Sequence, residues 1–255
     1  MHIVFYCVWI PGIILQALLL FRGWRSANIR NFPFFYSYIA AGTAAAIIGF
    51  AVLNMDVSLY RRSYWVVQFC TLIAGCGLIL ETFDHVLSPY PGAKNFARRL
   101  CLVSFAMILA SGVAYSRLIN PGQLSVSEIQ LERDVRCAQI ILFAGILAVM
   151  FYYELSLNRN TQGMIQGYGL YLATSLVSLA LRSYFGSGFD EIWNTLQPLA
   201  FDLSLLIWLF AFWAYSPGPA VVSTTNLESD YDALVATTRQ AVNSMRAYVG
   251  RAIRP

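Results

Sequence analysis

The sequence is poor in charge. Only 12% of its 255 residues are charged and 58% are hydrophobic, whereas a soluble domain carries about 25% charged residues. A soluble core of this size could not bury so much apolar surface, so the composition excludes an ordinary water-soluble globular domain. The 17 basic and 13 acidic residues leave a formal charge of +4 and form no basic stripe, so we expect no nucleic-acid partner.

The chain is also poor in lysine and histidine, which excludes several cofactors. The only lysine, Lys94, lies between two apolar segments and not in the last one, so the chain is no retinal-binding photoreceptor. The two histidines, His2 and His85, are far apart, which argues against a metal site and against a haem held by two histidines. The five cysteines form no CxxC pair. Because P-loop, HExxH and GxSxG motifs are also missing, we expect no metal, no cofactor and no catalytic residue set.

The chain is rich instead in long apolar segments. Each is about 20 residues long, the length that an α-helix needs to cross a hydrocarbon core of about 30 Å. Seven membrane spans are predicted, over residues 3–21, 34–53, 64–86, 100–114, 137–155, 163–181 and 193–215. We therefore expect an all-α fold, that of a polytopic membrane protein, with a seven-helix transmembrane domain over residues 1–216 and a tail over residues 217–255.

The basic residues predict the orientation of this bundle in the membrane. Arg22, Arg25 and Arg30 follow the first predicted span, whereas the N-terminus before that span is uncharged. Basic connectors stay preferentially on the cytoplasmic side of a membrane. We therefore expect the N-terminus outside and the C-terminus in the cytoplasm.

The tail predicts an amphipathic cytoplasmic helix over residues 227–250. Its apolar side chains recur every three or four residues and so share one helical face. These residues are Leu227, Tyr231, Leu234, Val242, Met245 and Val249. Acidic residues gather at the start of the helix and arginines toward its end, which suits the helix dipole. Three interpretations stay open: the face lies on the inner leaflet, binds a helix of a partner protein, or folds against the protein's own loops.

Polar residues inside the predicted spans form the candidate site, because an ionised side chain near the bilayer centre costs about 2.5–3.5 kcal/mol on insertion scales. Asp202 lies near the middle of the last span, four residues after Pro198, and Arg182 at the end of the sixth span is its candidate partner. A structural ion pair and a functional proton or ligand site are both compatible with this position.

A second polar group lies at the end of the third predicted span. Glu81, Asp84 and His85 are spaced i, i+3 and i+4, which puts their side chains on one helical face. That spacing would suit a metal only if further ligands existed. We expect instead a hydrogen-bond network at the inner surface, with Arg98, Arg99 or Glu154 as its other members.

Four short motifs, in their order and spacing, resemble a seven-helix family of uncharacterised proteins abundant in acidobacterial genomes. The resemblance covers the seven predicted spans and not clearly the tail, and it implies a bacterial inner-membrane setting with no assigned activity. The motifs are Phe32-Pro33-Phe34-Phe35-Tyr36, Glu81-Thr82-Phe83-Asp84-His85, Leu131-Glu132-Arg133-Asp134-Val135-Arg136 and Ile207-Trp208.

These observations favour an accessory subunit or a sensory, ligand-binding membrane protein that acts through a partner. The alternative is a secondary transporter or channel that uses Asp202 and Glu81, although the segments show no internal repeat and no paired broken helices. A lipid-modifying membrane enzyme is a further alternative, for which no nucleophile–base pair is visible in the sequence.

Overall fold

The computed structural model describes residues 2–26, 28–53, 57–118, 124–155, 157–185, 190–214 and 227–252. Within these ranges, side chains are described for residues 9–49, 66–110, 133–178, 180–181, 195–214, 227 and 229–244. The side chains of Arg182, Met245 and Val249, which the sequence analysis singled out, lie outside the described residues.

All regular secondary structure in the described part of the chain is α-helical, which confirms the predicted all-α class. The helices are α1 (His2–Arg25), α2 (Asn28–Asn31), α3 (Pro33–Leu53), α4 (Val57–Val86), α5 (Pro91–Leu118), α6 (Leu124–Tyr152), α7 (Arg159–Phe185), α8 (Asp190–Ala211) and α9 (Leu227–Ala252). Most of them extend beyond the apolar segments that predicted them. The largest difference at a helix start is in α6, which begins at Leu124 instead of residue 137, and α5 begins at Pro91 instead of residue 100.

Local sequence explains several of the helix ends. Pro33 and Pro91 occupy the first positions of α3 and α5, where a missing N–H costs no hydrogen bond. The side chain of Asn158 accepts a 2.7 Å hydrogen bond from the Thr161 N–H and so caps the start of α7. After α6 ends, Glu154 adopts a left-handed backbone with φ of 47°, a conformation typical of helix termination.

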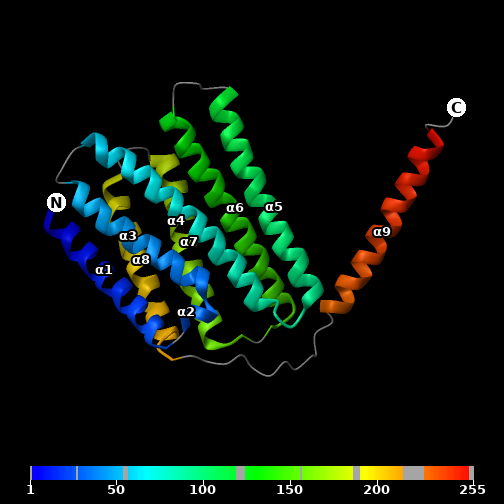
Figure 1. Ribbon diagram of the computed structural model, residues 1–255, viewed down its shortest axis with the longest axis horizontal. Helices are drawn as coiled ribbons and strands as arrows, with labels where there is room; N and C mark the ends of the chain where they lie inside the picture. Colours follow the sequence, from blue (N-terminus) through cyan, green and yellow to red (C-terminus); the bar gives the residue numbers. More distant parts are fainter. Residues whose placement is uncertain are drawn as a thin grey trace.

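Seven of the eight long helices described, α1 and α3 to α8, pack into one bundle (Figure 1). Helix α3 packs along α4, and α7 packs along α8, while α1 contacts both α8 and α3. Helix α4 is central because it also contacts α5, α6 and α7. The short α2 marks the end of the bundle at which α1, α4, α6 and α8 finish and α3, α5 and α7 begin (Figure 1). We call it the α2 end.

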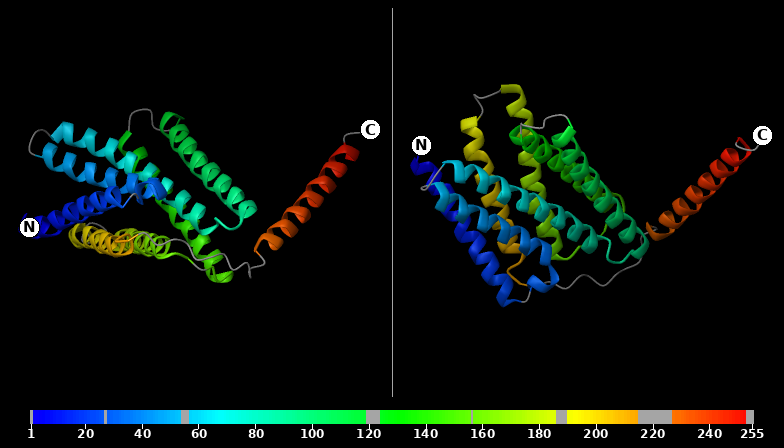
Figure 2. Two further views of the ribbon diagram at one scale, coloured as in Figure 1. Left: turned by 60° about the horizontal axis from the view of Figure 1, so that its bottom comes forward. Right: turned by 45° about the horizontal axis from the view of Figure 1, so that its top comes forward.

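Helix α9 leaves the bundle at the α2 end, as the two views in Figure 2 show. Of the other helices, it contacts α5. Leu227 in its first turn is buried and belongs to the hydrophobic core of the bundle.

The core is rich in aromatic rings. Trp208, Tyr168, Phe32, Phe35 and Phe212 are among the largest fully buried side chains. Phe35 of α3 stacks on Phe212 with a centroid separation of 4.4 Å and meets the edge of Trp208 of α8 at 5.3 Å. Such ring pairs add about 0.5–1.5 kcal/mol beyond the area that they bury, and they join α3 to the end of α8.

Two helices are long and apolar enough over described residues to cross a membrane, within Val66–Val86 of α4 and Arg133–Tyr152 of α6. Shorter apolar stretches lie at Pro33–Gly49 and Thr195–Ala211. These windows are compatible with a membrane protein but fewer than the seven predicted spans.

Candidate functional site

Glu81 of α4 binds the first turn of α3 at the α2 end. Its Oε1 accepts a 3.1 Å hydrogen bond from the Phe34 N–H, and its Oε2 accepts one of 2.6 Å from the Phe35 N–H. The side chain is only 4% exposed. The first N–H groups of a helix have no partner within the helix, and the helix dipole favours an acid there. Glu81 therefore fastens α3 to α4.

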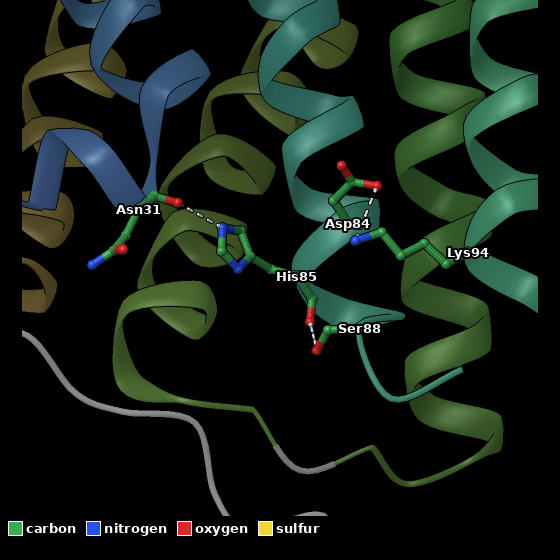
Figure 3. A network of polar contacts seen from close by, with 5 residues as sticks. All are labelled: Asn31, Asp84, His85, Ser88 and Lys94. Carbon is green, nitrogen blue, oxygen red and sulfur yellow. Dashed lines mark hydrogen bonds and ion pairs between the residues drawn. The ribbon is translucent and has the colours of Figure 1, made fainter. Parts of the chain in front are cut away.

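His85, one turn further along α4, contacts the short connection before α3. Its Nε2–H donates to the Asn31 carbonyl oxygen at 3.1 Å, and its ring stacks on Phe32 with a centroid separation of 4.4 Å. The Ser88 hydroxyl donates back to the His85 carbonyl at 3.0 Å and so closes the end of the helix (Figure 3).

Asp84 lies beside His85 but is paired elsewhere. One of its carboxyl oxygens is 3.7 Å from Nζ of Lys94 in α5, and Figure 3 shows His85 and Asp84 turned toward these different neighbours. Glu81, Asp84 and His85 thus share a helical face but serve three contacts, with α3, α5 and the α2 region. Among the described residues, no group of three or more His, Cys, Asp or Glu side chains could hold a metal ion.

The partners expected for this group were Arg98, Arg99 or Glu154, and the structure gives other ones. Lys94, one turn earlier in α5 than Arg98, is the basic residue that pairs with Asp84. Arg98, Arg99 and Glu154 are exposed side chains.

A set of side chains at the α2 end caps the last turn of α8. Arg22 of α1 donates to the Trp213 carbonyl at 3.0 and 2.7 Å, and its guanidinium lies 4.2 Å from the centre of the Trp213 ring. Asn160 of α7 is fully buried and donates to the Ala211 and Ala214 carbonyls at 3.1 and 3.2 Å. Ala211 is the last residue of α8, and a helix leaves its last carbonyls without intrahelical partners. Trp213 and Ala214 follow directly after the helix.

Two further side chains complete this cap. Arg159 donates to the Phe210 carbonyl at 2.6 Å, and Asn28 of α2 donates to the Phe212 carbonyl at 3.5 Å. Because cations are favoured at the negative end of the helix dipole, the two arginines stabilise α8 as well as joining it to α1 and α7.

Asp202 lies in the packing contact between α8 and α1. It is half-buried, and a Cβ added at Gly12 would stand 2.5 Å from its Oδ1. Pro11 and Pro198 lie within α1 and α8, so both helices lack a backbone N–H near this contact. Its expected partner, Arg182, has a side chain outside the described residues.

A larger polar cluster lies inside the bundle between α3, α6, α7 and α8. Arg136 of α6 donates to the Tyr171 hydroxyl of α7 at 3.1 Å. The Gln197 amide of α8 donates to the same hydroxyl at 3.5 Å and to the Ser175 hydroxyl at 3.2 Å. Tyr38 of α3 interacts electrostatically with Tyr171 and Arg136. We call these residues, together with Gln139 and Tyr168, the interior polar cluster.

The remaining members of the cluster come from α6 and α7. Gln139 is buried and donates to the Leu72 carbonyl of α4 at 3.2 Å and to Sγ of Cys76 at 3.5 Å. Tyr168 is fully buried and meets Tyr38 edge to face at 5.8 Å. Gln139 lies about 20 Å along α6 from the α2 end, at about 1.5 Å per residue, so the cluster is in the middle of the bundle.

Apolar rings and a glycine shape the walls of the cluster. Phe143 of α6 contacts Tyr168 edge to face at 5.7 Å, and Phe201 of α8 contacts Tyr171 at the same centroid separation. A Cβ at Gly75 of α4 would stand 2.9 Å from Nε2 of Gln139 and 3.1 Å from the Tyr168 hydroxyl. A larger residue at position 75 would therefore displace the end of the Gln139 side chain and crowd the Tyr168 hydroxyl.

The interior polar cluster could not be recognised from the ionisable residues of the apolar segments, because most of its members are glutamines and tyrosines. Arg136 belongs to a charged stretch that also contains Arg133 and Asp134. Those two form an exposed ion pair at 3.6 Å, whereas Arg136 turns inward to Tyr171. Gln139 and Gln197, two glutamines within predicted apolar spans, are the feature of the sequence that could have indicated this cluster.

The comparisons with known proteins identify no relative. No protein-family model, no curated protein and no solved structure matches the chain.

Proposed function

We propose that the chain is a bacterial inner-membrane protein whose seven long helices cross the bilayer, with the α2 end on the cytoplasmic side. The seven bundle helices have 21 to 30 residues. At about 1.5 Å per residue each is at least about 31 Å long, enough for a hydrocarbon core of about 30 Å.

The surface of the bundle supports this proposal. Many large apolar side chains point outward, among them Ile141 with 70% exposure and Met107 with 62%, and soluble monomers rarely expose large contiguous apolar patches. Exposed aromatic residues gather at the α2 end, as an interfacial aromatic belt would require. They are Phe21, Trp24, Phe96, Phe151, Tyr152 and Trp213.

Within the membrane, the protein acts as a sensory or ligand-binding protein, and the interior polar cluster is its ligand site. One observation carries this conclusion: the Arg136 guanidinium turns into the bundle and donates to Tyr171 in the company of Gln197. Arg136 is half-buried and lies near the outer end of the apolar Arg133–Tyr152 stretch of α6. An arginine within a membrane-spanning stretch is costly and marks a functional site by default.

The donors of the cluster indicate the kind of ligand. Arg136, Gln139 and Gln197 all donate N–H groups, and the cluster as defined contains no carboxylate. The buried Oε1 of Gln197 has no hydrogen-bond partner among the described residues. A molecule with a carboxylate or carbonyl oxygen, one N–H or O–H donor and an apolar body therefore matches the polar groups and the neighbouring aromatic rings.

A transporter that uses Asp202 and Glu81 is the weaker alternative. Glu81 is engaged by two backbone N–H groups of α3, so a change in its protonation would disturb the fold itself. Asp202 lies in a tight contact with Gly12 and not beside Glu81. Contacts that hold the helices together account for both Glu81 and Asp202.

Native mass spectrometry of protein extracted gently from its own membrane tests the ligand site. We expect a retained small molecule in the wild type and in Arg133→Gln, and its loss in Arg136→Gln. A hydrogen bond to a charged group contributes about 1.5–3 kcal/mol, so the Arg136 variant should bind about 10- to 150-fold more weakly. Arg133 is the matched control, since it lies on the same helix but is exposed.

Two outcomes would contradict the proposal. Equal retention of the molecule by the two arginine variants would place its site elsewhere. A wild-type protein that carries no small molecule but co-purifies with stoichiometric partner chains would be an accessory subunit instead.

Membership of the acidobacterial seven-helix family is a further part of the proposal, supported by the four motifs. In the folded chain the first two of them meet, because Glu81 of one motif binds the backbone of Phe34 and Phe35 in the other.

A further inference from the structure

Among the described side chains of helix α9, those that contact the bundle lie at its beginning. Leu227 is buried, the Tyr153 hydroxyl donates to the Asp230 carboxylate at 3.1 Å, and Tyr231 lies 6.3 Å from the ring of Phe96. From Asp232 to Ser244 every side chain except Val235 is exposed. The first two turns of α9 are thus docked, and the rest of its described side chains lie outside the bundle.

The exposed part of α9 needs a surface to lie on. Leu234 is 63% exposed and Val242 is 42% exposed, and both belong to the apolar face of the helix. A helix on its own in water is marginal even when its sequence is favourable, because most helical stability in proteins comes from packing an apolar face.

Charge distinguishes the two parts of the helix. Glu228 and Asp230 lie in the docked part and Asp232 follows directly, whereas residues 233–252 contain Arg239, Arg246 and Arg251 and no acidic residue. A helix with an apolar face and basic residues is suited to an interface with anionic lipids. The acidic residues of the docked part would be repelled from such a surface, and the bundle holds that part.

We infer that residues 234–252 of α9 lie on the anionic inner leaflet of the membrane, while the first two turns stay docked on the bundle. The inference rests on the proposed membrane embedding. The docking contacts with Tyr153 and Phe96 lie next to the exposed aromatic residues Phe151 and Tyr152, and so at the level of the proposed interface.

In Figure 1, α9 starts at the α2 end and runs back alongside the bundle while diverging from it, so its far end lies at the same height as the bundle helices. Binding to the leaflet therefore requires the helix to turn about its docked start until its axis lies along the membrane surface. The side-chain contacts described for α9 involve Leu227, Asp230 and Tyr231, so the part of the helix beyond them can change direction while these contacts are kept.

Hydrogen exchange of the full-length protein in lipid nanodiscs tests the inference. We compare nanodiscs of phosphatidylcholine alone with nanodiscs that also contain anionic phosphatidylglycerol. Each arginine contributes a factor of about five near an anionic leaflet, so exchange across residues 234–252 should slow by about 100-fold in the anionic nanodiscs. The triple variant R239Q/R246Q/R251Q should lose this protection.

The matched control is R25Q/R98Q/R99Q, which removes the same charge from exposed arginines of the bundle and should keep the protection. Equal exchange of the wild type in the two kinds of nanodisc would overturn the inference, as would protection that survives in the tail variant. If the amides of residues 234–252 were protected from exchange only when other membrane proteins are present, the apolar face of α9 would bind a partner chain instead of the leaflet. A protein that does not enter nanodiscs would refute the membrane embedding itself.

Discussion

Replacing Glu81 with alanine is expected to lower the free energy of unfolding of the bundle by about 3 kcal/mol or more. The substitution leaves the N–H groups of Phe34 and Phe35 without their acceptor, at a site where the side chain is 4% exposed. Each buried donor left unsatisfied costs about 1–3 kcal/mol, and the lost packing adds to this. For a chain of this size the melting temperature should fall by roughly 6–12 °C.

Thermal unfolding followed by circular dichroism in one detergent measures this effect. Glu81→Gln keeps one acceptor oxygen and should lie between the wild type and the alanine variant. Glu154→Ala is the control, because Glu154 is exposed and beyond the end of α6. A melting temperature unchanged in Glu81→Ala would mean that the junction of α3 and α4 does not depend on this carboxyl group.

The second large effect is expected at Gly163, where α7 and α8 approach most closely. A Cβ at Gly163 would overlap the Cβ of Ala211, an atom attached directly to the α8 backbone that cannot move aside. Overpacking of this kind costs about 1–3 kcal/mol, which outweighs the gain of about 1 kcal/mol that alanine brings to a helix. Gly163→Ala should therefore be less stable than the wild type.

Gly145 of α6 provides the matched control, because a Cβ there would meet nothing within 4 Å. Gly145→Ala should show only the propensity gain and unfold at the same or a slightly higher temperature. If the two variants changed stability in the same direction and by the same amount, the close contact between α7 and α8 would be refuted.

The helical class could be predicted from the sequence because it follows from the spacing of apolar residues. The helix ends were less predictable. Pro91 was interpreted as part of a connector, yet proline is well suited to the first turn of a helix, and α5 begins there. Helix α6 likewise begins at Leu124, within a polar stretch that was interpreted as a connector.

The partners of the polar residues could not be predicted, because they depend on which helices are neighbours. The i, i+3, i+4 spacing correctly puts Glu81, Asp84 and His85 on one side of α4, but their partners lie on other segments. Arg22 was singled out only for its charge and Asn160 not at all, although both cap α8 from positions far away in the sequence. Such backbone contacts leave no pattern in the sequence.

The interior polar cluster could not be predicted either, because its members come from different helices. Tyr168 and Gln139 are separated along the chain and become neighbours only when α6 and α7 pack around Gly75 of α4. Each residue alone is unremarkable in an apolar segment. Together with Arg136 they bring several hydrogen-bonding side chains to one place inside the bundle.

The membrane topology is the central claim, and thiol labelling with a membrane-impermeant maleimide tests it most directly. Single cysteines are introduced at the exposed positions Arg133, Ser88 and Gln240, in a background without the five native cysteines, and labelled in intact spheroplasts. We expect Arg133→Cys to react at once, and Ser88→Cys and Gln240→Cys to react only after the membrane is permeabilised. Equal labelling of all three in intact spheroplasts, or recovery of the protein in the soluble fraction, would contradict the account.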